Sequence, residues 1–209
     1  MNQQTEDYIF DHLDAESNVL NELYRFTNLN VPYPGMISGH EQGRLLSMFS
    51  RMARPDRILE IGTFTGYSAI CLAEGLTAEG HLHTIEHDDE IAEIALTFFE
   101  KAGLTDKITL HVGDALSIIP QFHIVFDLVF IDAAKKQYQE YYDAIFDKVR
   151  PGGYILADNI LWYGKVADAL IQDETTVVMR SFNNFVRNDE RVEKAIVQNR
   201  DGLFILRKK

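Results

Sequence analysis

Four polar side chains in the second half of the sequence have the types and the spacing that metal-assisted chemistry needs. Asp132 and Lys135 follow one apolar run, and Asp158 and Asn159 follow another. If the two runs are neighbouring parallel strands, their carboxyl ends open into the same crevice. Asp132, Asp158 and Asn159 would then bring three oxygen ligands together. Oxygen ligands without thiolates select Mg²⁺, Ca²⁺ or Mn²⁺.

Two conditions decide whether this set can act together. Successive side chains of a strand point to opposite faces, so Asp158 and Asn159 can share an ion only where the strand ends. The alternative is that this pair caps a turn. Lys135 stands at the expected start of a helix, where the helix dipole disfavours a cation. With a divalent ion nearby, we expect a lowered pKa and a role as general base, and the alternative is an exposed lysine.

A second group of residues predicts a nucleoside site. The segment Glu60-x-Gly62-x-x-x-Gly66 ends an apolar run and opens a helix-like stretch. Glycine lets the backbone approach a ligand closely, and a helix start offers free N–H groups. We place Glu60 in the turn, where it would repel a pyrophosphate. Glu86 ends the next run, and a carboxylate there can accept both hydroxyls of a ribose. S-adenosylmethionine (SAM) fits this set, because it has a ribose and a cationic sulfonium but no phosphate. Asp114, after the third run, is expected near the adenine or a neighbouring loop.

Alternating β-like and helical runs predict the elements that position these residues. The expected strands are 58–62, 81–86, 108–113, 127–132, 154–158, 192–198 and 203–207. The expected helices of this part are 67–76, 89–102, 115–119, 135–149 and 175–188. Such alternation forms right-handed βαβ units around a buried parallel sheet, and Asp201-Gly202 predicts a hairpin.

We therefore expect an α/β fold of the class I SAM-methyltransferase type. It has a Rossmann-like, seven-stranded sheet with a C-terminal antiparallel hairpin. The chain is expected to be one domain (1–209), with an N-terminal helical region (1–53) and a Rossmann-like core (54–209). This assignment rests on an analogy between folds.

Composition limits the class of protein further. The 209 residues carry a net charge of −12, which argues against broad binding to nucleic acid or to an anionic membrane. No apolar run approaches the ~20 residues of a membrane span. The polar N-terminus lacks the pattern of a secretory signal, so we expect a cytoplasmic protein. The single cysteine, Cys71, excludes an internal disulfide and is expected in the core.

With these motifs, the chain resembles the cation-dependent O-methyltransferases, the group of caffeoyl-CoA and catechol O-methyltransferases, from about residue 34 to residue 207. The motifs are Met36-x-Ser38 with Glu41-x-Gly43, Glu60-Ile61-Gly62-x-x-x-Gly66-Tyr67-Ser68, Phe130-Ile131-Asp132-Ala133-x-Lys135, Asp158-Asn159-x-Leu161-Trp162-x-Gly164 and Asp201-Gly202.

The resemblance implies a cofactor, a metal and a catalytic residue. The implied SAM contacts are Ser38, Glu60, Gly62, Thr63, Ser68, Glu86 and Ala115, to which we add Met36, Asp114 and Asp132. Asp132, Asp158 and Asn159 match the family's metal ligands, with Mg²⁺ as the first expectation, and Lys135 matches its catalytic lysine. The family is commonly dimeric, so a homodimer is expected.

Two positions depart from the plant enzymes of this family. Those enzymes have a SAM-contacting aspartate where this chain has Ala134, and a substrate-contacting asparagine where it has Tyr163. The second departure argues against a phenylpropanoid-CoA acceptor. The stretch 131–135, followed by Gln137-Tyr138, also resembles the bacterial tRNA 5-hydroxyuridine methyltransferases of the same superfamily.

Four functions remain open at this point. The first is methyl transfer to a small catechol or vicinal diol, whose pocket Trp162 and Tyr163 help to shape. The second is methyl transfer to 5-hydroxyuridine in tRNA. The third is a SAM-binding module without catalysis, which the intact metal set and Lys135 oppose. The fourth is a nicotinamide-dependent dehydrogenase, which Glu60 and the lack of a G-x-G-x-x-G segment oppose.

Overall fold

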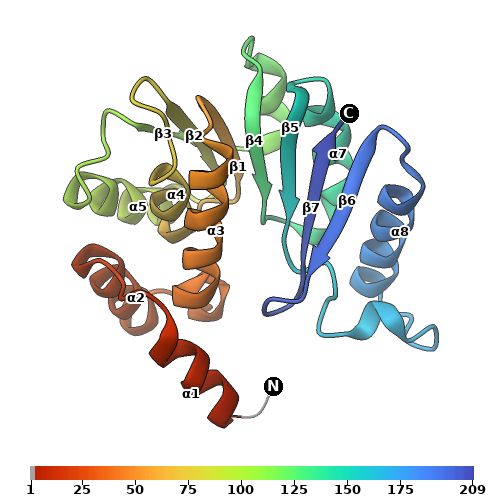
Figure 1. Cartoon of the computed structure of the whole chain (residues 1–209), viewed down its shortest axis with the longest axis horizontal. Helices are drawn as coiled ribbons and strands as arrows, with labels where there is room; N and C mark the ends of the chain where they lie inside the picture. Colours follow the sequence, from red (N-terminus) through yellow and green to blue (C-terminus); the bar gives the residue numbers. More distant parts are fainter. Residues whose placement is uncertain (1–2) are drawn as a thin grey trace.

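A computed structural model describes residues 3–209, in which seven strands form one sheet in the order β3-β2-β1-β4-β5-β7-β6 (Figure 1). The strands are β1 (Arg57–Ile61), β2 (His81–Glu86), β3 (Ile108–Val112), β4 (Phe126–Ile131), β5 (Val149–Ala157), β6 (Val192–Val197) and β7 (Leu203–Lys208). The first five pair in parallel, and β7 runs antiparallel to both β5 and β6. The predicted fold, with its C-terminal hairpin, is confirmed.

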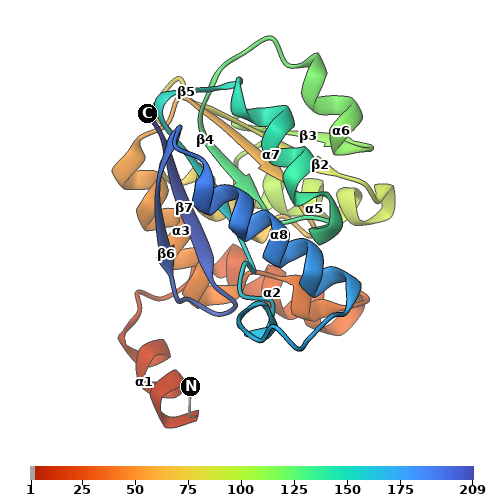
Figure 2. The ribbon, with the colours of Figure 1, turned by 90° about the vertical axis from the view of Figure 1, so that its right-hand side faces the viewer.

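The helices divide between the two faces of this sheet (Figures 1 and 2). One face packs against α2 (Asn18–Asn30), α3 (Gly39–Ala53), α4 (Tyr67–Ala73) and α5 (Asp89–Lys101). The other face packs against α6 (Ala115–Ile118), α7 (Tyr138–Phe146) and α8 (Glu174–Asn188). Because both faces are covered, the central strands are apolar without alternation, as in Leu128–Ile131 of β4, which are all buried.

The N-terminal region is helical, as expected, and it is interrupted where the two prolines stand. α1 (Gln3–His12) and α2 precede a short 3₁₀ turn, η1 (Pro34–Met36), and α3 follows. Figures 1 and 2 show α1 extending away from the rest of the molecule. Apolar side chains are exposed on α1, among them Tyr8 and Phe10, and on α2, among them Leu29.

The predicted bounds of one helix and one strand were wrong. The helix expected at 135–149 begins as a 3₁₀ turn, η3 (Lys135–Gln137), and α7 ends at Phe146. The strand expected from residue 154 begins at Val149. Pro151-Gly152-Gly153 has the composition of a turn, but the structure accommodates it as an irregularity in the pairing of β4 with β5.

Within the described residues, no helix is long and apolar enough to span a bilayer. The cytoplasmic location stays a prediction. Cys71 is fully buried in α4, and burial raises the pKa of its thiol to about 12. The expectation of an inert core cysteine is therefore confirmed.

Candidate active site

A pocket of about 1410 Å³ lies at the carboxyl ends of the central parallel strands. The strand order reverses between β1 and β4, and the open end of such a switch point is where α/β sheets bind ligands. Pockets for one small ligand measure roughly 300–1,000 Å³, so the volume of this pocket is compatible with two reactants. All predicted site residues line it except Glu60. They are Met36, Ser38, Gly62, Thr63, Ser68, Glu86, Asp114, Ala115, Asp132, Lys135, Asp158, Asn159, Trp162 and Tyr163.

Gly62 and Gly66 each allow a close contact with another part of the chain, and the two contacts differ. Gly62 has a φ of +98°, and a Cβ atom there would lie 2.1 Å from the carbonyl oxygen of Asp132. Only glycine lets the loop after β1 pass the end of β4 at this distance. A Cβ atom on Gly66 would instead lie 2.6 Å from the ring of Phe99 in α5, and Gly66 does not line the pocket. Gly66 therefore serves helix packing, not the approach of a ligand.

Glu86 at the end of β2 orders the loop beneath the pocket. Its Oε2 accepts the backbone N–H of Phe64 at 2.7 Å, and its Oε1 accepts those of His87 and Asp88 at 2.8 and 3.0 Å. Phe64 is left-handed, with a φ of +47°, and the carboxylate holds it there. Glu86 also lines the pocket, so its free lone pairs are available to ribose hydroxyls.

Glu60 requires a correction. It lies within β1, not in the turn, and its side chain is fully buried outside the lining of the pocket. Its Oε2 accepts from Thr84 at 2.5 Å, and Thr84 lies 2.5 Å from the hydroxyl of Thr63. Burial raises the pKa of the Glu60 carboxyl to about 8. Glu60 therefore reaches the pocket indirectly, through residues such as Thr63 that line it.

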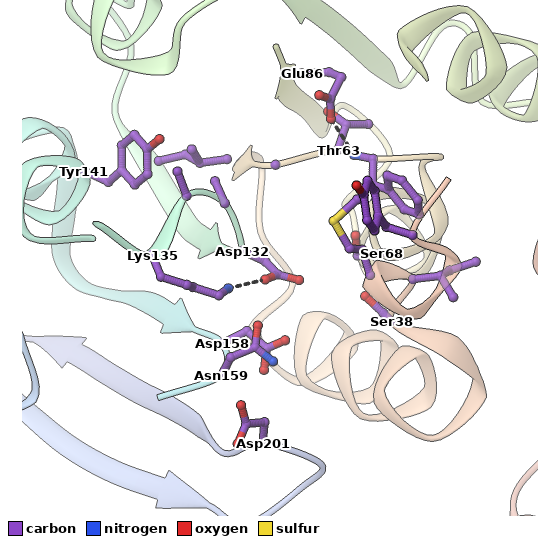
Figure 3. A pocket seen from close by; sticks show the side chains of 18 of the residues that line it. Ser38, Thr63, Ser68, Glu86, Asp132, Lys135, Tyr141, Asp158, Asn159 and Asp201 are labelled. Carbon is purple, nitrogen blue, oxygen red and sulfur yellow. Dashed lines mark hydrogen bonds and ion pairs between the residues drawn. The ribbon is translucent and has the colours of Figure 1, made fainter. Parts of the chain in front are cut away.

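The loop after β3 supplies the remaining cofactor candidates. Asp114 caps α6, where its Oδ2 accepts the N–H of Ser117 at 2.9 Å and its hydroxyl at 2.7 Å. Ala115 follows directly and is buried. Figure 3 shows Ser38 and Ser68 on one side of the pocket, across from Tyr141. These positions agree with a nucleoside that spans the ends of β1, β2 and β3.

Lys135 and Asp132 both follow β4, and their side chains point toward each other (Figure 3). Its Nζ donates to Asp132 Oδ1 at 2.8 Å and to the Tyr138 hydroxyl at 2.6 Å. Burial acts to lower the pKa of Lys135, but the charge of Asp132 and the two hydrogen bonds outweigh it, so the pKa lies above its usual value. The expected lowering depends on a divalent cation near Lys135, so it stays a prediction.

Sequence reasoning did not identify Tyr138 as part of the site. Its buried hydroxyl accepts from Lys135 and donates to the carbonyl oxygen of Asp158 at 3.0 Å. One side chain thus connects the ends of β4 and β5. Its signal in the sequence was its spacing, three positions after Lys135 in a helical stretch.

Asp158 and Asn159 satisfy the condition that was set for them. β5 ends at Ala157, and Asn159 turns to a left-handed φ of +55°, so the two side chains no longer alternate. Figure 3 shows them together, next to the pair of Lys135 and Asp132. Burial and the charge of Asp132 raise the pKa of Asp158 to about 6. Two carboxylates this close together favour a cation between them.

The chemistry of this donor set fits a hard divalent cation. Within residues 3–209, His, Cys, Asp and Glu side chains do not gather in threes in a way that could hold a metal. A cation here therefore depends on the amide oxygen of Asn159, beside the carboxylates of Asp132 and Asp158. Two carboxylates and an amide, without thiolate or imidazole, match the preferences of Mg²⁺, Ca²⁺ and Mn²⁺.

The turn 159–164 lines the pocket next to Asp158. Trp162, Tyr163 and Gly164 all have positive φ values of 47°, 57° and 76°. The β6–β7 hairpin holds this turn through Asp201. The carbonyl oxygen of Asp201 accepts the N–H of Leu161 at 2.9 Å, and its Oδ1 accepts the N–H of Tyr163 at 2.6 Å. The Tyr163 side chain is 78% exposed. Its conformation is therefore set by distant backbone contacts and not by burial.

The charges that line the pocket are mainly negative. The acidic residues are Glu86, Asp114, Asp132, Asp158 and Asp201, and the lysine and arginine residues are Lys135 and Arg200. Both basic side chains already have partners in the protein, since Lys135 pairs with Asp132 and Arg200 donates to backbone carbonyls. The pocket thus offers little attraction to a polyanion.

Comparisons with known proteins agree with this geometry. The model of the O-methyltransferase family matches residues 11–209. A caffeoyl-CoA O-methyltransferase of Populus kitakamiensis is 36% identical over 83% of this chain and 79% of its own length. A catechol O-methyltransferase of Niastella koreensis is 33% identical over 94% of this chain and 90% of its own.

A solved structure gives the same result. The O-methyltransferase TomG of Streptomyces achromogenes, crystallised with SAM, superimposes with a TM-score of 0.92 and 30% identity over 100% of both chains. The chain therefore belongs to the O-methyltransferase family, and the enzyme class expected from the sequence, a SAM-dependent O-methyltransferase, is confirmed.

Proposed function

We propose that this enzyme transfers the methyl group of SAM to a hydroxyl of a small acceptor that carries two neighbouring oxygens, such as a catechol, and that it needs a divalent cation. The observation that carries the proposal is one pocket with two parts. Gly62, Glu86 and Asp114 line its cofactor part, and Asp132, Lys135, Asp158 and Asn159 meet in its other part.

The residues of the cofactor part would hold the methyl donor in a fixed direction. Glu86 would accept the ribose hydroxyls, because its carboxylate lines the pocket at the end of β2. Ser38, Thr63 and Ser68 offer hydroxyls near the start of α4, and Met36 offers an apolar contact. A donor fixed in line with the acceptor oxygen can account for roughly 7–11 kcal/mol of the barrier at best.

The residues of the other part would prepare the acceptor. Asp132, Asp158 and Asn159 would hold the cation, with Mg²⁺ as the first candidate and Mn²⁺ or Ca²⁺ as alternatives. A cation held there supplies positive charge that lowers the pKa of a nearby hydroxyl and orients its oxygen. Once its contact with Asp132 loosens, the Lys135 ammonium would release a proton to water, and the neutral amine would then take the proton of that hydroxyl. Tyr138 would keep the Lys135 nitrogen directed to this place, since it bonds both Lys135 and Asp158.

The charges of the pocket support a small acceptor over tRNA. Phosphate contacts need basic side chains, whereas five carboxylates line this pocket. The half-buried Trp162 and the exposed Tyr163, with ring centroids 5.3 Å apart, are suited to a flat aromatic ring at the pocket mouth.

A methyl-transfer assay tests the proposal. Catechols and a tRNA carrying 5-hydroxyuridine are offered side by side, with Mg²⁺ and with a chelator. We expect transfer to catechol that stops with chelator and returns with added Mg²⁺. Transfer to tRNA alone would move the assignment to the second acceptor, and transfer that ignores the chelator would overturn the cation requirement.

We also propose a homodimer formed through the N-terminal helices. The exposed apolar side chains Tyr8, Phe10, Leu29, Met48 and Met52 lie on α1, α2 and α3, and α1 has few neighbours within its own chain (Figure 1). A second copy of the chain would cover them. Sedimentation equilibrium should give a dimer that Phe10→Asp with Leu29→Asp converts to a monomer, and a monomeric wild type would contradict this proposal.

A further inference from the structure

A buried glutamine on α3 contacts one of the proposed metal ligands from outside the pocket. Gln42 is only 2% exposed, and its Nε2 donates to Asp158 Oδ2 at 2.8 Å. It does not line the pocket, so it touches neither of the two reactants there. Any influence of Gln42 on the chemistry must therefore pass through Asp158.

We propose that Gln42 is a positioning residue for the cation site, which fixes the carboxylate of Asp158 so that Oδ1 is presented to the ion. This inference rests on the proposed cation requirement. A carboxylate can bind a cation through either oxygen or both. Because Gln42 occupies Oδ2, it selects one oxygen and one rotamer of Asp158 before the ion arrives.

The orientation of the Gln42 amide is determined from both ends. Arg200 donates its Nη1 to Gln42 Oε1 at 3.2 Å, and a guanidinium can only donate. An ionised carboxylate can only accept, so Asp158 requires the NH₂ group of the amide. A flipped amide would lose both hydrogen bonds. Arg200 therefore keeps the Gln42 donor directed at Asp158.

Arg200 is itself held in place by the segment before α3. The same Nη1 donates to the carbonyl oxygen of Ile37 at 3.0 Å and to that of Ser38. Next to it, the Asn199 Nδ2 donates to Glu41 Oε1 at 3.1 Å. The hairpin between β6 and β7 is thus tied to the residues just before Gln42 at the start of α3, and a rigid support of this kind preserves the orientation of a metal ligand.

Deep burial makes this support matter for Asp158. The side chain is 3% exposed, and the neighbouring Asp132 carboxylate repels it. Without the Gln42 donor, Oδ2 would lose its hydrogen bond, and we expect the carboxylate to rotate toward Lys135, whose positive charge already acts on it. That rotation would remove Oδ1 from the other ligands of the proposed cation site.

The experiment measures binding of Mn²⁺ to the whole enzyme without SAM or acceptor, by electron paramagnetic resonance. Gln42→Met keeps the size of the side chain and removes its hydrogen bonds. Gln42→Asn keeps the amide but is one methylene too short to reach Asp158. Both should bind Mn²⁺ about 10-fold to 100-fold more weakly, the range seen when residues that support metal ligands are replaced. Binding of S-adenosylhomocysteine should change by less than about 2-fold.

Controls separate this role from a structural one. Gln121→Met replaces an exposed glutamine outside the pocket and should leave Mn²⁺ affinity unchanged. Arg200→Lys retains a donor and should bind Mn²⁺ more tightly than Arg200→Met, although both lose the same guanidinium. A purely structural role would lower the melting temperature of Gln42→Asn while leaving its Mn²⁺ affinity intact.

The outcomes also separate this inference from the proposed function. If Gln42→Met and Gln42→Asn bind Mn²⁺ as the wild type does, Gln42 is not a positioning residue, and the cation requirement stands. If the wild type binds no Mn²⁺ and transfers methyl groups in the presence of chelator, the cation requirement fails and this inference fails with it.

Discussion

The cofactor part and the acceptor part of the pocket are built in different ways. In the cofactor part, Glu86 and Thr84 bond the loop after β1, which lies next to them in the sheet. In the acceptor part, the turn 159–164 and Asp158 depend on α3 and on the β6–β7 hairpin, up to 116 residues away along the chain. The contacts that hold the cofactor part join neighbouring strands and their loops, whereas those that hold the acceptor part join segments far apart along the chain.

Burial follows the same division. Thr63 and Ser68 are 1% and 5% exposed, whereas Tyr163 is 78% exposed. Thr63 and Ser68 also fill the core, so they can change little without loss of the fold. Tyr163, at the mouth of the acceptor part, is free to vary. One fold can therefore keep a single methyl donor while its acceptor changes.

Replacing Lys135 should have the largest effect on catalysis. We expect Lys135→Met to lower kcat by roughly 10²–10⁴-fold, the usual contribution of a general base, with binding of S-adenosylhomocysteine unchanged. Lys136→Met is the matched control, because Lys136 is exposed and pairs with Glu174. Single-turnover kinetics with catechol would make the measurement. Equal rates for the two variants would remove Lys135 from the mechanism.

Two glycines compare the tolerance of the two parts directly. Gly62→Ala places a methyl group against the backbone of Asp132 at a positive φ, and we expect a loss of about 3 kcal/mol or more in unfolding free energy. Gly164 also has a positive φ, but no atom lies within 4 Å of its Cβ position. Gly164→Ala should therefore cost only about 1 kcal/mol. Urea unfolding measures both, and equal losses would contradict the comparison.

The buried carboxyl of Glu60 should make stability depend on pH. Its pKa is about 8 in the folded protein, against an ordinary value of 4.5. Between these values the unfolded chain has lost a proton that the folded chain retains, so stability falls as the pH rises. The fall from about pH 5 to pH 8 should reach about 3 kcal/mol.

Glu60→Gln should remove most of this slope, because the amide stays neutral throughout the range. Thermal unfolding at several pH values compares the variant with the wild type and with Glu79→Gln, which replaces an exposed carboxylate. If Glu60→Gln keeps the wild-type slope, the buried carboxyl is not its origin.

The sequence predicted the residues at the strand ends better than the residues that support them. Gly62, Glu86 and Asp158 were found because each follows an apolar run, and strand ends converge in a parallel sheet. Glu60 was placed in the turn because it is the polar residue of an otherwise apolar run. The local sequence does not show whether such a side chain meets a buried partner, such as Thr84, or solvent.

Contacts between distant segments leave no such local pattern. Gln42 and Arg200 were not identified, because they meet Asp158 only after α3, β5 and the hairpin have packed together. The contacts of Lys135 were not predicted, for a related reason. The spacing placed Lys135 beside a helix start, but it did not reveal the direct contacts with Asp132 and Tyr138.

A smaller effect is expected when Glu86 loses its charge. In Glu86→Gln an NH₂ group would face one of the backbone N–H groups that the carboxylate now accepts. Hydrogen bonds to charged groups contribute about 1.5–3 kcal/mol, so calorimetry should show binding of S-adenosylhomocysteine weakened by about 10-fold or more. Mn²⁺ affinity should stay unchanged. Glu90→Gln, at an exposed position of α5, is the control.

The smallest effect should come from Tyr163, and it tests whether the acceptor part is as free to vary as its exposure implies. Tyr163→Asn introduces a residue type that tolerates the left-handed φ of +57°. The hydrogen bond to Asp201 comes from the backbone N–H of residue 163 and does not involve its side chain. Stability and cofactor binding should therefore stay within experimental error of the wild type. Only the ring at the pocket mouth is lost, so KM for different catechols should shift by about 2-fold to 10-fold, most for those with bulky apolar substituents. If kcat fell together with cofactor affinity, the two parts of the pocket would be coupled through this turn, and the acceptor could not change independently of the methyl donor.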